Sequence, residues 1–445
     1  MFRRILIANR GEIALRILRA CRLLGVETVI AHSKVDEDSM PVRLADTAVC
    51  IGNATPAETY LNIPALLTVA EMCAVDAIHP GIGFLAENEN FARLVEAHGY
   101  VFIGPDPEHI GKMGDKIIAK ETARNLGIPV VPGSDGGVTT AQEARAIADS
   151  IGYPVILKAA AGGGGRGMKL AHHADEIDEA LSLCRTEARA AFGDDQVYIE
   201  KYLDNPRHIE IQVIGDQHGN CVHFFERDCS VQRRHQKVVE EAPSPILNHS
   251  QRQEIGARVT TALSMMRYKG VGTIEFLYED GEFYFIEMNT RLQVEHTISE
   301  MITGVDLVKA QIRVAAGEKL WMHQDDIPLR GHAIECRINA EDPQNFLPSP
   351  GTVTTYHAPG GPGVRIDSHM FEGYVVPPYY DSLAVKLIVW APDRQQCIGR
   401  TQLALSEFVI SGIKTNLSLH EEILMSEDFR SGDYNIKWLE NFLQR

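Results

Sequence analysis

Short apolar runs alternate with helical stripes of apolar residues in the first quarter of the chain. The runs, each short enough to be a strand, lie at residues 4–8, 27–31, 74–78 and 101–104. After the first run, apolar residues recur at 13, 17, 21 and 24, which is helical spacing, and Gly25 would end that helix. Strands that alternate with helices predict a doubly wound parallel sheet, so we expect a Rossmann-like domain over residues 1–113.

Sheets of this kind often bind a dinucleotide at the turn after the first strand. Here that turn, Asn9-Arg10-Gly11, has one glycine rather than the G-x-G-x-x-G pattern of a dinucleotide site. The N-terminal pattern therefore argues against an NAD-binding protein.

The pattern changes over residues 114–317. Pro129, Pro132 and Gly133 lead into a segment with a glycine-rich loop at residues 160–168. We expect a central domain over 114–317 that contains a smaller inserted lid at about 131–203. A predicted hairpin at 271–289 ends the part of the chain richest in candidate functional residues.

The last part of the chain, residues 330–445, starts with a predicted strand at 332–340. A loop rich in proline and glycine follows at 347–363, then an apolar strand at 383–390 and a helical C-terminal region. This order is typical of an antiparallel sheet packed with helices. The expected fold class is therefore α/β, with α+β character in part.

Charge and composition narrow the class of protein. The formal net charge is −17, which disfavours nucleic acid and anionic membranes as partners. No run approaches 18 apolar residues, and the N-terminal apolar run is too short for a signal peptide, so we expect a cytoplasmic protein without a membrane span. The eight cysteines form no C-x-x-C pair and are expected to be free thiols. Anionic substrates would require positive charge to be gathered locally.

The glycine loop is the first candidate for chemistry. Gly162 to Gly165 and Gly167 weaken local structure, but they let backbone N–H groups approach an anion closely. The loop follows an apolar strand that ends at Lys158, yet it lacks the Gly-Lys-Ser/Thr ending of a Walker A sequence. A flexible surface loop is the alternative interpretation.

Residues 285–295 alternate between polar and apolar side chains. If this stretch is extended, period-2 geometry places its polar groups on one face; these are Glu287, Asn289, Arg291, Gln293 and Glu295. A strand with one solvated face would explain the polarity, but not this choice of carboxylates, amides and a guanidinium.

Glu275 precedes Glu287 across a predicted turn that contains Asp280-Gly281. Carboxylates and the amide of Asn289 are oxygen ligands of the kind Mg²⁺ prefers beside phosphates. Pairing 275 with 287 requires a turn longer than two residues, or a bulge. We therefore predict one of these two irregularities.

A third feature is the segment 226–237, where four cationic or potentially cationic side chains lie between Arg233 and Lys237. In so acidic a protein this is where anions could be received. A nuclear-type basic patch is the alternative, and the interleaved acidic residues argue against it.

Together these segments resemble the biotin carboxylase family of the ATP-grasp superfamily. The matching strings lie at residues 5–13, 79–81, 162–168, 199–203, 226–237, 287–296 and 377–381. They span nearly the whole chain in the family's order and spacing. The resemblance implies a central ATP-grasp domain, and a ligase in which ATP activates bicarbonate to carboxyphosphate, whose CO₂ is transferred to biotin.

The resemblance also implies a role for individual residues. Lys116 and Lys158 would hold the ATP phosphates, covered by Gly162, Gly163, Gly164 and Gly165. Adenine would be bound by Glu200, Lys201 and Leu203. The nucleotide pocket would be lined by His208, Gln232 and His235. Mg²⁺ (or Mn²⁺) would be held by Glu275, Glu287 and Asn289, and bicarbonate by Lys237, Arg291, Gln293 and the Val294 backbone. Glu295 would be the general base.

Arg337 would stabilise the biotin enolate, and its alternative is a structural salt bridge with Glu335 or Glu341. A guanidinium fork suits a planar anion such as bicarbonate, and a glycine lid would protect carboxyphosphate from water.

The chain also departs from the family. Ile82 stands where the family has tyrosine near biotin, and Leu23 and Pro362 stand where bacterial acetyl-CoA carboxylase members have an acidic and an aromatic residue at the dimer face. These departures concern the biotin contacts and the dimer face, and a homodimer is still expected.

The chain has no Ala/Val-Met-Lys-Met biotinylation string, so we expect a separate biotin carboxyl carrier protein and separate carboxyltransferase subunits. Acetyl-CoA carboxylase, which makes malonyl-CoA for fatty acid biosynthesis, is the favoured parent enzyme. Propionyl-CoA, pyruvate and 2-oxo-acid carboxylases remain open. The rival functions are another ATP-grasp ligase and a non-catalytic protein that only binds nucleotide within a complex.

Overall fold

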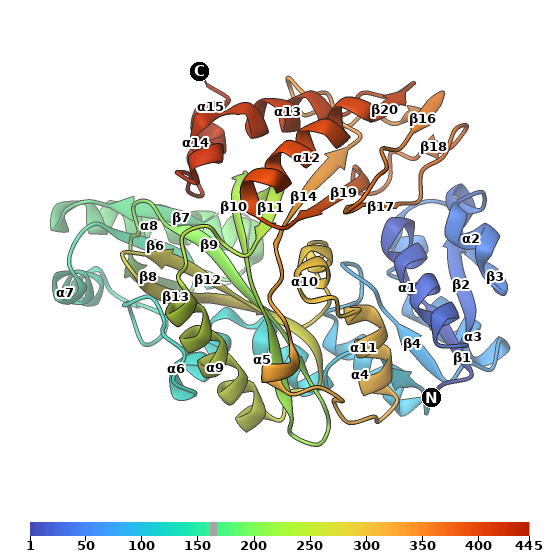
Figure 1. Ribbon diagram of the computed structural model, residues 1–445. Coiled ribbons are helices and arrows are strands. Elements are labelled where there is room, and N and C mark those ends of the chain that lie inside the picture. Colours follow the sequence, from blue (N-terminus) through green and yellow to red (C-terminus); the bar gives the residue numbers. More distant parts are fainter. Residues whose placement is uncertain (161–166, 445) are drawn as a thin grey trace.

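A computed structural model describes residues 1–160 and 167–444. The N-terminal part is a five-stranded parallel sheet of order β3-β2-β1-β4-β5 (Figure 1). Its strands are β1 Arg4–Ile7, β2 Glu27–Ser33, β3 Thr47–Gly52, β4 Ala77–His79 and β5 Val101–Phe102. Helices α1 Gly11–Leu23, α3 Ile63–Met72 and α4 Glu89–Ala97 complete the doubly wound arrangement, which confirms the predicted fold class for this part.

Two details of the N-terminal prediction were wrong. The strand expected at 74–78 is β4, which begins only at Ala77, because Ala74 (φ 47°) and Val75 form the turn that ends α3. The edge strand β3 was not predicted. Its residues are mostly exposed or half-buried, so the segment lacks the apolar run that marks an interior strand.

The largest sheet has eight antiparallel strands in the order β13-β12-β9-β10-β11-β14-β19-β17. The strands are β9 Arg207–Gly215, β10 Cys221–Arg233, β11 Gln236–Ala242, β12 Gly270–Glu279, β13 Glu282–Asn289, β14 His332–Asn339, β17 Val364–Ser368 and β19 Leu383–Ala391. Residues 330–445 therefore extend the central sheet through the β11–β14 pairing rather than forming an isolated one. Helices α12 Arg394–Glu407, α13 Leu417–Met425, α14 Glu427–Ser431 and α15 Trp438–Phe442 lie in the red C-terminal part above it (Figure 1).

A smaller antiparallel sheet projects from one side of the molecule. It consists of β6 Val155–Ala159, β7 Met168–Ala171 and β8 Val197–Lys201. Helices α7 Ala141–Ile151 and α8 Ile177–Phe192 share a separate apolar core with it, as expected for an inserted lid. The predicted glycine loop at Gly162–Gly165 falls between β6 and β7 and lies outside the described residues.

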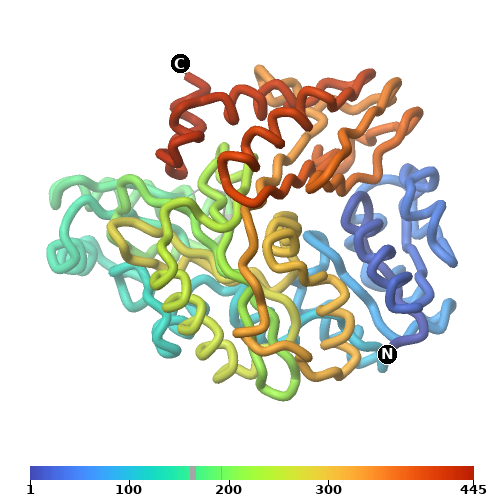
Figure 2. Tube along the Cα trace, in the orientation of Figure 1, coloured from blue at the N-terminus to red at the C-terminus, as the bar shows by residue number. Residues whose placement is uncertain are grey.

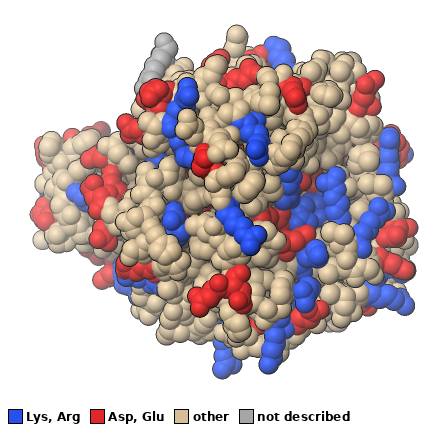
Figure 3. Space-filling model, viewed as in Figure 1, with Lys and Arg blue, Asp and Glu red and all other residues tan. Residues whose placement is uncertain are grey.

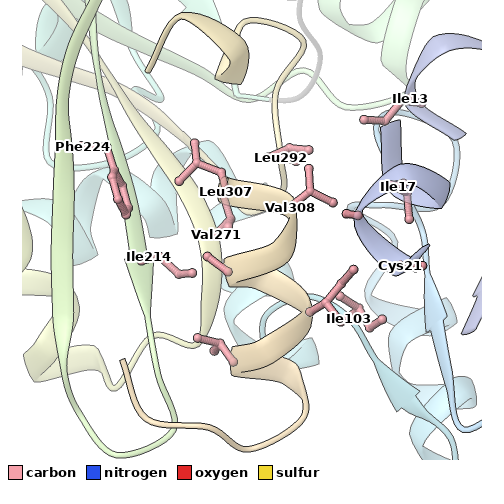
Figure 4. Close-up of a cluster of buried hydrophobic side chains, with 14 of the residues drawn as sticks. Ile13, Ile17, Cys21, Ile103, Ile214, Phe224, Val271, Leu292, Leu307 and Val308 are labelled. Atoms are coloured by element: carbon pink, nitrogen blue, oxygen red, sulfur yellow. The ribbon is translucent and has the colours of Figure 1, made fainter. Parts of the chain in front are cut away.

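One apolar core joins the N-terminal part to the large sheet. Helices α10 His296–Thr303 and α11 Leu307–Ala315 lie between them. Ile13 and Ile17 of α1 share this core with Val308 of α11 and Val271 of β12 (Figure 4). The C-terminal end of β13 and the start of α10 are thereby held against the N-terminal part.

The chain trace places the two termini on different sides of the molecule (Figure 2). On the face drawn in Figure 3, acidic and basic side chains are interleaved, and basic ones gather in a recess right of the centre. Positive charge is thus concentrated locally despite the net charge of −17. Within residues 1–160 and 167–444, no helix is both long and apolar enough to cross a membrane.

Candidate active site

The β12–β13 hairpin places two carboxylates side by side. Glu275 pairs directly with Glu287, and Thr273 pairs with Asn289. The turn itself has two residues, because Glu279 pairs with Glu282, and a bulge between Glu275 and Phe276 restores the required register. The predicted pairing is confirmed, and the bulge rather than a longer turn produces it.

The extended conformation predicted for residues 287–295 was wrong beyond Asn289. The strand ends there, and the chain turns into α10, whose N-cap is Glu295. The reason is tertiary: the Leu292 side chain is fully buried in the large core, and the Thr290 N–H donates to Glu87 of the N-terminal part. Period-2 geometry holds only while the strand continues.

Two polar side chains of this segment nevertheless donate to the same carboxylate, that of Glu275. Its Oε1 accepts from Asn289 Nδ2 at 2.9 Å and from Gln293 Nε2 at 2.7 Å. Its Oε2 lies 3.0 Å from His208 Nε2. Although burial by itself lowers the pKa of His208, Glu275 leads the contacts that raise it to about 9. The turn into α10 thus brings Gln293 to the same carboxylate as Asn289.

Lys237 of β11 lies at the centre of the site. Its Nζ donates to Glu210 Oε2 at 2.5 Å, Glu295 Oε1 at 2.6 Å and Glu275 Oε1 at 3.0 Å. Burial alone would lower the pKa of Lys237, but the three carboxylates raise it well above its ordinary value. Lys237 is therefore a fixed positive charge at neutral pH.

The other cationic residues of the 233–237 segment lie apart from Lys237 and its carboxylate partners. Arg234 and His235 form the tight β10–β11 turn with positive φ and are exposed, and Arg233 lies over the Phe346 ring at 3.6 Å. Strand alternation and the turn separate these side chains from Lys237. Of these four side chains, Lys237 is therefore the one that contacts the carboxylate cluster.

Glu295 links Lys237 to Arg337 of β14. Arg337 Nη2 donates to Glu295 Oε2 at 2.9 Å, and its Nε donates to Glu240 of β11. These ion pairs differ from the Glu335 or Glu341 salt bridge considered as the alternative for Arg337. Burial raises the pKa of Glu240 to about 7. Burial alone would also raise the pKa of Glu295, but Lys237, Arg337 and Arg227 together lower it to about 2. Of the two carboxylates on Arg337, Glu295 is thus the one that is fully ionised at neutral pH.

Arg291 lies at the edge of the same cluster and is the most accessible of its cations, with 20% of its side chain exposed. Its Nη2 donates to Asn289 Oδ1 at 2.7 Å, and its Nε donates to Glu87 Oε2 at 2.7 Å. The N-terminal part therefore contributes a carboxylate to the site. No pattern in the sequence had indicated Glu87.

Two more residues that the sequence analysis missed lie behind the cluster. Arg227 is fully buried and donates to Glu210, Gln212, Thr273, Ser299 and Gln293. Because Arg227 donates to Gln293 Oε1, the Gln293 amide must turn its NH₂ toward Glu275. A period-2 pattern of polar residues at 208, 210 and 212 could have identified Glu210.

The expected nucleotide residues lie next to this cluster and on the lid. Glu200 of β8 accepts from Lys158 Nζ at 2.6 Å and from Lys120 Nζ at 2.7 Å, and Lys120 had not been predicted. Lys201 donates instead to the Gly152 and Tyr153 carbonyls. A pocket here is lined by residues that include Lys116, Lys120, Ser134 and Tyr198. Leu203 and Gln232 are buried.

Several groups of donors in the described part of the chain could hold a cation. Among the described residues, His208, Glu210 and Glu275 offer ligand atoms within 4.8 Å of one another. Another group is the set predicted from the sequence, Glu275, Glu287 and Asn289. Within it, burial and then the negative charge of Glu275 raise the pKa of Glu287. Two adjacent carboxylates with this repulsion, next to the Asn289 amide, suit a hard divalent cation.

Models of known protein families match three consecutive parts of the chain. Residues 1–110 match the family model for the biotin carboxylase N-terminal domain, 115–323 that for the ATP-binding domain of the carbamoyl-phosphate synthase L chain, and 335–441 that for the biotin carboxylase C-terminal domain. A biotin carboxylase of Haemophilus influenzae is 56% identical over 100% of this chain and 99% of its own length. A pyruvate carboxylase component of Methanothermobacter thermautotrophicus is 52% identical over 99% of this chain and 90% of its own.

Two solved structures have similar folds. Campylobacter jejuni biotin carboxylase superposes with a TM-score of 0.94 at 48% identity, covering 99% of both chains. The biotin carboxylase domain dimer of Hydrogenobacter thermophilus 2-oxoglutarate carboxylase, solved with MgADP and bicarbonate, gives 0.93 at 49% identity, covering 99% of this chain and 98% of that one.

Proposed function

The chain belongs to the biotin carboxylase family of ATP-dependent ligases, and we propose that it uses ATP and bicarbonate to carboxylate a biotin held on a separate biotin carboxyl carrier protein. The observation that supports this most directly is the single carboxylate Glu295 held between Lys237 and Arg337. The proposed base thereby contacts both the proposed cation for bicarbonate, Lys237, and the proposed cation for biotin, Arg337.

In the first proposed step, bicarbonate binds to Lys237, Arg291, the Gln293 amide and the Val294 backbone. Glu295 takes the bicarbonate proton as a bicarbonate oxygen attacks the γ-phosphorus of ATP, and ADP leaves. The product is carboxyphosphate. When bicarbonate draws Lys237 toward itself, Glu295 loses part of its positive surroundings, which raises its pKa and makes it a stronger base.

In the second step, carboxyphosphate breaks into CO₂ and phosphate. Arg337 stabilises negative charge on the ureido oxygen of biotin while the released phosphate takes the N1′ proton and N1′ attacks CO₂. The Arg337 guanidinium is suited to this because Glu240 and Glu295 fix it from two sides. Both steps require that water is excluded, and the lid sheet beside the nucleotide residues suits that purpose.

The remaining roles follow the family pattern. Lys116, Lys158 and Gly162–Gly165 are proposed to hold the phosphates, and Glu200, Lys201, Leu203, His208, Gln232 and His235 to line the nucleotide pocket. Mg²⁺ or Mn²⁺ would be held by Glu275, Glu287 and Asn289, where it would neutralise phosphate charge. We also propose an N-terminal domain over residues 1–113, an ATP-grasp domain over 114–317 with a lid at about 131–203, and a C-terminal domain over 330–445.

The parent enzyme is proposed to be an acetyl-CoA carboxylase with separate carboxyltransferase subunits. Relatives named as pyruvate and 2-oxoglutarate carboxylase components keep other acceptors open. Isolation of the carrier protein bound to this chain, followed by identification of its carboxyltransferase, decides among them. A homodimer is also proposed, and the exposed Leu23 and Pro362 would lie at its interface.

The function itself is tested by ADP release with and without bicarbonate, and with added free biotin. Bicarbonate-dependent ATP cleavage that biotin stimulates supports the proposal. Cleavage stimulated by an amino acid but not by bicarbonate would show a different ATP-grasp ligase. ATP binding without turnover would show a non-catalytic, nucleotide-binding protein.

A further inference from the structure

Lys386 of β19 is a fully buried lysine to which the proposed reaction assigns no role. Its Nζ donates to the Val294 carbonyl at 2.9 Å and lies 3.2 Å from Glu12 Oε1 of α1. Val294 stands between Gln293 and Glu295 in the segment that links β13 to α10. The N-terminal, central and C-terminal parts of the chain therefore meet at one backbone carbonyl.

The peptide group before Val294 is also held. The Gln293 carbonyl accepts from His296 Nδ1 at 2.7 Å and from the His296 N–H at 3.3 Å. A carbonyl can only accept, so His296 carries its proton on Nδ1, and burial lowers its pKa well below the ordinary value. Because the peptide is trans, the Val294 N–H points away from this carbonyl, and it has no acceptor among the residues described.

Lys386 fixes the next peptide group in the chain. Burial alone would lower its pKa, but the carboxylates of Glu12, Glu335 and Asp367 raise it, so the ammonium stays charged. A charged donor forms a shorter and stronger hydrogen bond to a carbonyl than a neutral one. The orientation of the Val294 backbone is thus set from both sides, by His296 and by Lys386.

We infer that Lys386, held by Glu12, is a positioning residue that orients the Val294 backbone for binding of the one-carbon anion. This rests on the proposed function, which assigns bicarbonate to Val294. Lys386 itself touches no substrate in this arrangement. A purely structural ion pair would predict no specific effect on bicarbonate.

The test is Lys386→Met, assayed for bicarbonate-dependent ADP release and for ATP binding. We expect the KM for bicarbonate to rise about tenfold, the effect of losing one well-placed charged hydrogen bond, with ATP affinity within about twofold of wild type. Lys386→Arg keeps a charged donor and should recover most of the loss. Arg252→Met, which breaks a buried ion pair with Glu226 away from the site, is the matched control and should leave this KM unchanged.

Lys386→Met leaves Glu12 buried without its partner, so a second variant guards against misfolding. Lys386→Met/Glu12→Gln removes both charges of the pair and should fold more readily. It should show the same increase in KM. An unchanged bicarbonate KM in either folded variant overturns the inference, whereas wild-type protein without bicarbonate-dependent turnover would overturn the proposed function instead.

Discussion

Replacement of Lys237 by methionine is the perturbation with the largest expected effect. The lysine side chain is 12% exposed and contacts Glu210, Glu275 and Glu295 at 2.5 to 3.0 Å. Methionine has a similar shape but no charge. The substitution therefore leaves three carboxylates facing one another with no ammonium between them.

The buried position of Lys237 sets the size of two expected losses, one in unfolding free energy and one in turnover. Breaking a buried ion pair by removing one partner costs about 3–5 kcal/mol of unfolding free energy. The variant also loses a preorganised positive charge from the proposed bicarbonate site, which corresponds to a loss of about 10²–10³ in turnover. The first effect is measured by urea unfolding, and the second by bicarbonate-dependent ADP release.

The pH dependence of the unfolding free energy independently tests the contact between Lys237 and Glu295. In the wild type Lys237 leads the contacts that lower the pKa of Glu295 from its ordinary 4.5 to about 2. A carboxylate with a lowered pKa stabilises the fold above the unfolded pKa and loses that contribution as pH falls through the folded pKa. The wild type should therefore lose the Glu295 contribution to its stability as pH falls from about 4.5 toward 2, and this acid-dependent loss should be largely absent from Lys237→Met, because its Glu295 carboxylate lacks the ammonium that lowers the pKa.

Arg252→Met is again the control variant, because it should lose stability without losing turnover. It breaks the buried pair with Glu226 and should lose a similar amount of stability. Its turnover, measured on the folded fraction, should stay near that of the wild type. Bicarbonate-dependent turnover of Lys237→Met within about threefold of the control would refute the reasoning, because the charge would then serve only stability.

Three further predictions concern residues in contact with this cluster. Glu295→Gln should reduce carboxybiotin formation by at least about 10²-fold while ATP titration shows unchanged affinity, since only the base is lost; near-normal turnover would remove Glu295 from that role. Arg337→Met should depress biotin carboxylation more than bicarbonate-dependent ATP cleavage, and equal losses would contradict an enolate role. His208, whose pKa is raised to about 9, stabilises the fold fully below its ordinary pKa of 6.5, and this contribution is lost as pH rises through 9. Urea midpoints of wild type and His208→Gln should therefore converge between pH 6.5 and 9, and parallel profiles would count against the His208–Glu275 pair.

Local patterns in the sequence accounted for much of the fold. The strands at 4–8, 27–31, 332–340 and 383–390 were placed to within about two residues, because period-2 and period-3.6 patterns depend only on neighbours in the chain. The β12–β13 register was predicted by requiring Glu275 and Glu287 to share a face, and the bulge supplies the irregularity that this pairing needs. The candidate functional residues of 287–295 were chosen by their chemical types, and the extended conformation assumed for them ends at Asn289.

Tertiary structure decided the contacts that complete the site. Glu87 and Arg291 lie 204 residues apart, and Lys386 and Val294 lie 92 apart, so no local period relates them. The turn after Asn289 follows from burial of Leu292 in a core shared by α1, α10 and α11. The amino-acid sequence by itself thus determined which side chains can carry the chemistry, because residue type and short-range spacing are local. Their convergence on Lys237 and Glu295 was decided only by packing of the N-terminal part and the eight-stranded sheet around α10, because burial of apolar surface acts between segments far apart in the chain.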